Sequence, residues 1–84
     1  MLWYVYIAKA RTGRYYIGIT TNVDRRIEKH NSGKGSRLAI QQGPFSLVYR
    51  SESFPGKSEA RMREAQLKKW SRIKKEKLIK GEWK

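Results

Sequence analysis

The chain has 84 residues and a formal net charge of +13 at pH 7, from 20 lysines and arginines against 7 acidic residues. The absence of cysteine excludes disulfides and thiolate metal sites and fits a reducing compartment. A chain of this length is too short to bury a second core, so residues 1–84 are expected to form one domain. No apolar run approaches the roughly 18 residues that span a bilayer, and we expect a cytoplasmic protein that does not enter a membrane.

The positive charge is spread over the whole chain rather than confined to a tail. A molecule with this charge is attracted to polyanions, and nucleic acid is the first candidate partner. An anionic membrane surface is one alternative, and a role of the charge in solubility alone is another. The basic residues expected to contact nucleic acid lie in several parts of the chain: Lys9, Arg14, Arg25, Lys29, Lys34, Arg37, Lys68 and Lys69.

Two strands joined by a tight turn are predicted within residues 3–18. Residues 2–8 are apolar on both faces, which is typical of a strand buried on two sides. A three-residue turn over 11–13, ending in a glycine in the left-handed conformation, would close the hairpin. That turn places Ala10 opposite Arg14 and thereby fixes the register of the whole pair.

In this register Tyr6 faces Gly18 and lies diagonal to Tyr16, so the two phenols share one face of the sheet. A turn one residue longer or shorter would put them on opposite faces. Because Gly18 has no side chain, we expect room beside it for a ligand to approach the strand. The other face of the second strand carries Tyr15, Ile17 and Ile19.

A helix is predicted from about Val23 to Asn31, after a cap at residue 20, 21 or 22. Its inward stripe combines two aliphatic residues, Val23 and Ile27, with Arg26 and His30. A guanidinium and an imidazole beside packing residues indicate a polar pocket at the edge of the core. The glycine-rich, basic segment 31–43 that follows is expected to be a loop over this pocket.

The second half of the chain predicts a third strand over 45–54 and one long helix over 58–79, capped by Ser58. Glu64 lies at the margin of the helix's apolar stripe, half turned inward, where a carboxylate needs a partner. The apolar stripe itself is formed by Ala60, Leu67, Trp70, Ile73 and Leu78. The expected fold is therefore α+β, with a three-stranded antiparallel sheet in β-β-α-β-α order flanked by helices.

These elements and motifs resemble the GIY-YIG nuclease superfamily, in particular its small stand-alone single-domain bacterial members, over nearly the whole chain. The two family motifs match residues 4–6 and 16–18, with Tyr4 in place of the family's glycine. An asparagine that several of these nucleases carry beyond the glutamate has no counterpart, and Glu76 occupies that region. The family's remaining functional positions match Arg26, His30 and Glu64.

The resemblance implies a metal-dependent endonuclease that hydrolyses phosphodiester bonds in DNA or structured nucleic acid, with DNA the expected partner. Its catalytic residues would be Tyr6, Tyr16, Arg26, His30 and Glu64. Glu64 would be the protein ligand of one Mg²⁺ or Mn²⁺ ion, which a single carboxylate binds weakly until substrate is present.

Tyr6, Tyr16 and His30 are all candidates for the base that deprotonates the water. Tyr6 is favoured, and His30 would then accept its proton or bind phosphate. Arg26 would bind the phosphate through two contacts, and the surrounding positive charge is expected to favour the phenolate form of the tyrosine. No accessory DNA-binding domain is expected, so sequence specificity should be poor, and a protein partner is one candidate source of specificity.

Each residue also has a purely structural explanation. Tyr6 and Tyr16 could be core aromatics, and Glu64 could pair with Lys68 one helical turn away. The alternative function is therefore a nucleic-acid-binding module that keeps the nuclease fold but does little chemistry.

Overall fold

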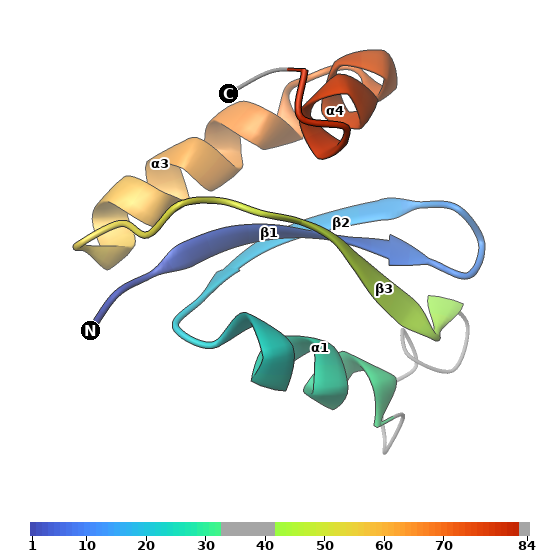
Figure 1. Ribbon diagram of the computed structural model, residues 1–84, viewed down its shortest axis with the longest axis horizontal. Coiled ribbons are helices and arrows are strands. Elements are labelled where there is room, and N and C mark those ends of the chain that lie inside the picture. The colour runs from blue at the N-terminus through green and yellow to red at the C-terminus, as the bar shows by residue number, and fades with distance from the viewer. Residues whose placement is uncertain (33–41, 83–84) are drawn as a thin grey trace.

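A computed structural model describes residues 1–32 and 42–82. The strands form one antiparallel sheet in the order β2-β1-β3. Figure 1 shows α1 on one face of this sheet and α3 with α4 on the other. This arrangement confirms the predicted α+β class with its three-stranded sheet. The elements follow one another as β1 (Tyr4–Ala10), β2 (Tyr15–Thr20), α1 (Val23–Asn31), β3 (Phe45–Arg50), α3 (Lys57–Lys68) and α4 (Arg72–Ile79).

The hairpin between β1 and β2 has the predicted register. The backbone N–H of Ala10 donates to the carbonyl of Arg14 at 2.8 Å. Gly13 has a φ of 94°, a conformation that strains residues with a side chain. Tyr6 pairs with Gly18, and Tyr16 lies diagonal to Tyr6 on the same face of the sheet.

Each face of the sheet carries its own apolar cluster. On the α1 side the buried members are Tyr6, Ala8, Ala10, Val23 and Phe45. On the side of α3 and α4 they are Val5, Ile7, Ala60, Leu67 and Leu78. Residues 15, 17 and 19 of β2 point to the face opposite Tyr16 and pack against this second cluster, as the alternation along the strand predicts.

The third strand is shorter and less regular than predicted. It ends at Arg50 rather than near residue 54, and Phe54 pairs separately with Trp3. A bulge lets Ile7 face Tyr49 while its neighbour on β1 faces Leu47. The bulge interrupts the alternation expected across 45–50, since residues 48 and 49 both pack against the α3 and α4 cluster.

The prediction of one long helix over 58–79 is wrong, because the chain forms two helices there. α3 ends at Lys68, and the hydroxyl of Ser71 accepts the backbone N–H of Lys74 at 3.2 Å to cap α4. The serine oxygen serves as hydrogen-bond acceptor for a backbone N–H in the first turn of α4, which in an uninterrupted helix would bond to a carbonyl of the preceding turn. Ser58 is also not the cap of α3, which starts after Gly56.

The break redirects the apolar residues of the last helix. Leu78 reaches the core and is 2% exposed, whereas Ile73, predicted to lie on the buried stripe, is 69% exposed. Within residues 1–32 and 42–82, no helix combines the length and the apolar character needed to cross a bilayer.

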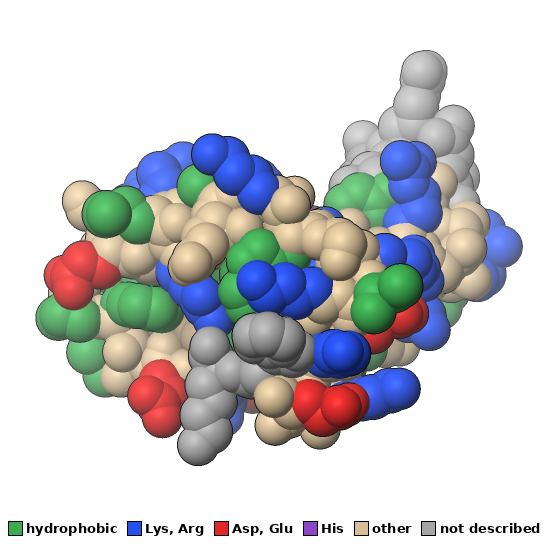
Figure 2. Space-filling model, turned by 90° about the horizontal axis from the view of Figure 1, so that it is seen from above, with side chains coloured by type: hydrophobic (Ala, Val, Ile, Leu, Met, Phe, Trp, Pro, Cys, Tyr) green, Lys and Arg blue, Asp and Glu red, His purple; other side chains and the backbone are tan. Residues whose placement is uncertain are grey.

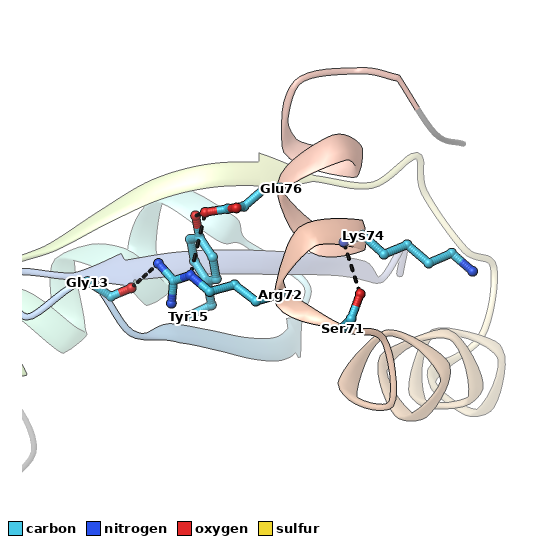
Figure 3. Close-up of polar contacts among 6 residues, drawn as sticks. All are labelled: Gly13, Tyr15, Ser71, Arg72, Lys74 and Glu76. Atoms are coloured by element: carbon cyan, nitrogen blue, oxygen red, sulfur yellow. Dashed lines mark hydrogen bonds and ion pairs between the residues drawn. The ribbon is translucent and has the colours of Figure 1, made fainter.

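Polar contacts tie α4 to the β1–β2 hairpin (Figure 3). The Arg72 guanidinium donates to the carbonyl of Gly13 at 3.0 Å, and the Tyr15 hydroxyl donates to Glu76 at 3.0 Å. Arg72 and Glu76 also pair with each other at 3.5 Å. These contacts hold the end of the chain over the turn of the hairpin, on the face opposite α1.

Candidate active site

The phenol of Tyr6 lies across Gly18 on the neighbouring strand. A methyl group built on Gly18 would sit 2.5 Å from the Tyr6 hydroxyl oxygen and 2.7 Å from Cζ. The space where a Gly18 side chain would lie is therefore filled by the protein's own tyrosine, while Gly18 itself lines the cleft described below, as the expected room for a ligand requires. The absent side chain lets the Tyr6 hydroxyl reach the edge of the sheet, because β2 is an edge strand.

His30 extends from the last turn of α1 to the same hydroxyl. Its Nε2 lies 3.2 Å from the Tyr6 oxygen, and its ring centroid is 5.3 Å from that of Phe45. Burial lowers the pKa of His30, and the charges of Arg26 and Lys29 lower it further. The imidazole is thus held neutral at pH 7, in the form that accepts a proton.

The pKa of Tyr6 is raised above its usual 10.0, chiefly by burial. Arg26 opposes this effect and Glu64 adds to it. Burial outweighs the guanidinium, so the expectation that positive charge would favour phenolate is wrong for the protein alone. At neutral pH the pair consists of a neutral phenol and a neutral imidazole.

Glu64 approaches the same place from α3, on the other face of the sheet. Its side chain is 14% exposed and pairs with Lys68 Nζ at 3.4 Å. The structural explanation of Glu64 as a partner of Lys68 therefore holds, but the carboxylate also lines a cleft with Tyr6 and Arg26.

This cleft has a volume of about 280 Å³ and opens at the edge of β2, with side chains from both α1 and α3 in its lining. Three residues predicted for the site line it, and His30 adjoins it through Tyr6. The cleft is lined by Trp3, Tyr6, Gly18, Ile19, Arg26, Lys57, Arg61 and Glu64.

Lys57 and Arg61 were not predicted to belong to the site. They precede Glu64 on α3 by seven and three residues, a spacing that puts all three on one side of a helix. That spacing is the signal from which they could have been found. Their charges give the cleft three cations around one carboxylate, an environment suited to the oxygens of a phosphate group.

Tyr16 shares the α1 face with Tyr6 but is not among the residues that line the cleft. Its ring packs edge-on against Phe45, with centroids 5.5 Å apart and planes at 82°. Glu76 also lies elsewhere, because its carboxylate accepts the Tyr15 hydroxyl beside the hairpin turn.

The basic residues predicted to contact nucleic acid are divided among several surfaces. Arg25 and Lys29 line a second hollow along α1. Lys9 and Arg14 are exposed beside the hairpin turn, and Lys69 is exposed next to α4. Figure 2 shows basic side chains distributed over the surface of α3 and α4. Lys68 pairs with Glu64. The remaining two, Lys34 and Arg37, lie outside the described residues with most of the loop predicted over the site.

Comparison with known proteins identifies the family. The family model described as the GIY-YIG catalytic domain matches residues 2–77. UPF0213 protein BH0048 of Halalkalibacterium halodurans is 50% identical over 76 residues, which cover 90% of this chain and 80% of that protein.

Two solution NMR structures resemble this one. The structure of UPF0213 protein BH0048 from Bacillus halodurans has a TM-score of 0.59 at 49% identity, covering 95% of this chain and 84% of that one. The structure of protein EF2693 from E. faecalis has a TM-score of 0.64 at 37% identity, covering 96% and 85%. The chain belongs to the GIY-YIG catalytic domain family.

Proposed function

We propose that this protein is an endonuclease that hydrolyses phosphodiester bonds in nucleic acid, with DNA as the first candidate substrate. The observation that carries the proposal is one cleft lined by Tyr6, Arg26 and Glu64, with His30 in contact with the tyrosine. Family membership supports a nuclease, and the net charge of +13 supports a polyanionic substrate. The lack of cysteine fits action in the cytoplasm.

Tyr6 and His30 would act as a proton relay. A neutral phenol is a poor base, but Tyr6 can pass its proton to His30 Nε2, 3.2 Å away, as it takes one from the attacking water. The lowered pKa of His30 keeps this acceptor free at neutral pH. A positioned base of this kind contributes about 10² to 10⁴ in rate.

Arg26, Lys57 and Arg61 would hold the substrate phosphate in the cleft. A planar guanidinium binds two phosphate oxygens at once, which orients the phosphorus relative to the water. The same cations offset the negative charge that develops on the phosphoryl oxygens in the transition state.

The residues present fit one hard divalent cation rather than a protein cage. Among the described residues, no three His, Cys, Asp or Glu side chains group to hold a metal, so Glu64 would act as the single protein ligand. Mg²⁺ binds well through one carboxylate together with substrate oxygens and waters. When bound, Mg²⁺ or Mn²⁺ would supply further neutralisation of charge on the phosphate and the leaving oxygen.

Hydrolysis of branched, single-stranded and duplex DNA in the presence of Mg²⁺ or Mn²⁺ tests the proposal. We expect cleavage that Glu64→Gln abolishes while binding is retained. Glu52→Gln removes the same charge from an exposed position outside the cleft and should leave cleavage unchanged. Salt-sensitive binding without cleavage of any of the substrates would contradict the proposal and support the alternative, a binding module.

A further inference from the structure

A second hollow lies along α1, next to the cleft. It has a volume of about 650 Å³, and we call it the α1 groove. Arg26 lines both the cleft and the α1 groove. A chain that places one phosphate against Arg26 in the cleft can therefore continue directly into the groove.

The charges of the α1 groove are unbalanced. Arg25, Arg26 and Lys29 line it together with one carboxylate, that of Glu28. The ion pairs found within the described part of the chain are Lys68 with Glu64 and Arg72 with Glu76, so none of these three cations is paired there.

The spacing of these cations costs stability when the groove is empty. Arg25 and Lys29 are four residues apart on α1, where like charges repel each other. The groove also adjoins the first turn of α1, whose backbone dipole is positive. A bound anion relieves both effects. Thr21 also lines the hollow, whereas the Thr20 hydroxyl is already bonded to the backbone of Asn22.

We propose that the α1 groove binds the backbone phosphate next to the one that is cut, so that the protein requires a chain with at least two phosphates. This inference rests on the proposed function for the identity of the cleft as the scissile site. It assigns Arg25 and Lys29 to substrate binding at the neighbouring nucleotide, which separates their contribution from that of Arg26.

The test measures binding of a short fluorescent thymidylate strand by anisotropy, without divalent cation, over a range of salt concentrations. Arg25→Gln/Lys29→Gln should weaken binding about tenfold and reduce the slope of log affinity against log salt by about 1 to 2. The matched control, Lys77→Gln/Lys80→Gln, removes the same charge at exposed positions near the end of α4. The affinity of this control for the strand should fall about twofold. Equal losses of affinity in the two double variants would overturn the assignment.

A second measurement follows backbone amide shifts by NMR in the wild-type protein. The dinucleotide dTpdT, with one phosphate, should move the resonance of Arg26, while dTpdTpdT should also move those of Arg25 and Lys29. Shifts of Arg25 and Lys29 with inorganic phosphate but not with dTpdTpdT would overturn the assignment to a nucleic-acid chain. Neither measurement needs catalysis, so binding through the groove without any hydrolysis would contradict the proposed function alone.

Discussion

The hydroxyl of Tyr6 occupies the place that a side chain on Gly18 would take. A Cβ at Gly18 would lie 2.5 to 2.9 Å from three atoms of the phenol, closer than packed atoms approach each other. The glycine of the second motif is therefore needed for the position of the tyrosine of the first, and through it for the contact with His30.

Gly18→Ala should displace the Tyr6 ring and break its contact with His30. We expect a loss of about 1 to 3 kcal/mol in the free energy of unfolding, together with loss of most of the proposed nuclease activity. Gly56→Ala is a matched control, because the nearest atom to its added carbon is a flexible carboxylate oxygen of Glu59 at 3.1 Å. Thermal unfolding and cleavage assays measure both effects, and a Gly18→Ala protein as active as wild type would contradict the packing argument.

The partly buried imidazole of His30 should make stability depend on pH on the acid side. Burial, Arg26 and Lys29 lower the pKa of His30 below its usual 6.5, so the unfolded chain binds a proton where the folded protein does not. Stability is therefore lost as the pH falls below about 6.5. The unfolding midpoint of wild type should decrease more steeply on acidification than that of His30→Gln, and parallel curves would count against a neutral histidine in the folded protein.

The titration of Tyr6 should make stability depend on pH in the opposite direction, with a loss at alkaline pH. Because burial raises the pKa of Tyr6 above 10.0, the unfolded chain loses the phenolic proton first, and stability is lost as the pH rises above about 10. Tyr6→Phe should remove this part of the alkaline decrease, which a pH series of thermal unfolding measures. If the stability of the variant falls as steeply with rising pH as that of wild type, Tyr6 has the same pKa in the folded and the unfolded protein, which contradicts the prediction.

Asn31 should be a main determinant of the position of β3. Its side chain donates to the carbonyl of Phe45 at 2.9 Å and accepts the backbone N–H of Phe45 at 2.6 Å, replacing a missing strand partner. Asn31→Ala leaves both groups without their partner and should cost about 1 to 3 kcal/mol. Ser32→Ala, which removes an exposed hydroxyl bonded to Lys29, should cost much less, and urea unfolding compares the two.

Substitution of two serines can test whether residues 57–79 form two helices or one. Ser71→Ala should cost about 1 kcal/mol because it removes the cap of α4. Ser58→Ala should change stability by less than about 0.5 kcal/mol, since Ser58 lies inside α3. Equal effects of the two substitutions in chemical denaturation would be inconsistent with the break between α3 and α4.

Local patterns were sufficient to predict the hairpin and α1. Gly13 and the apolar runs on either side determine the turn and hence the pairing of Tyr6 with Gly18. The range of α1 follows from a cap within residues 20–22, which the structure places at Asn22, and from the inward stripe. In both cases the deciding contacts lie close together in the sequence.

Features that depend on contacts between distant residues were missed. The helical pattern continues through Ser71, and only the packing of Leu78 and the contacts of α4 with the hairpin show that the chain turns there. The bulge in β3 depends in the same way on Ile7 and its partner strand. The raised pKa of Tyr6 depends on burial, which the net charge and the presence of Arg26 in the sequence do not reveal.

The cleft draws its walls from both ends of the chain, because Tyr6 and Arg26 reach it from one face of the sheet and Glu64 from the other. During synthesis Tyr6 and Arg26 are made before Glu64, so a chain that ends at α1 holds the arginine proposed to bind phosphate but lacks the carboxylate. In the proposed function, hydrolysis therefore requires the docking of α3, which brings Glu64 to the cleft that Tyr6 and Arg26 line.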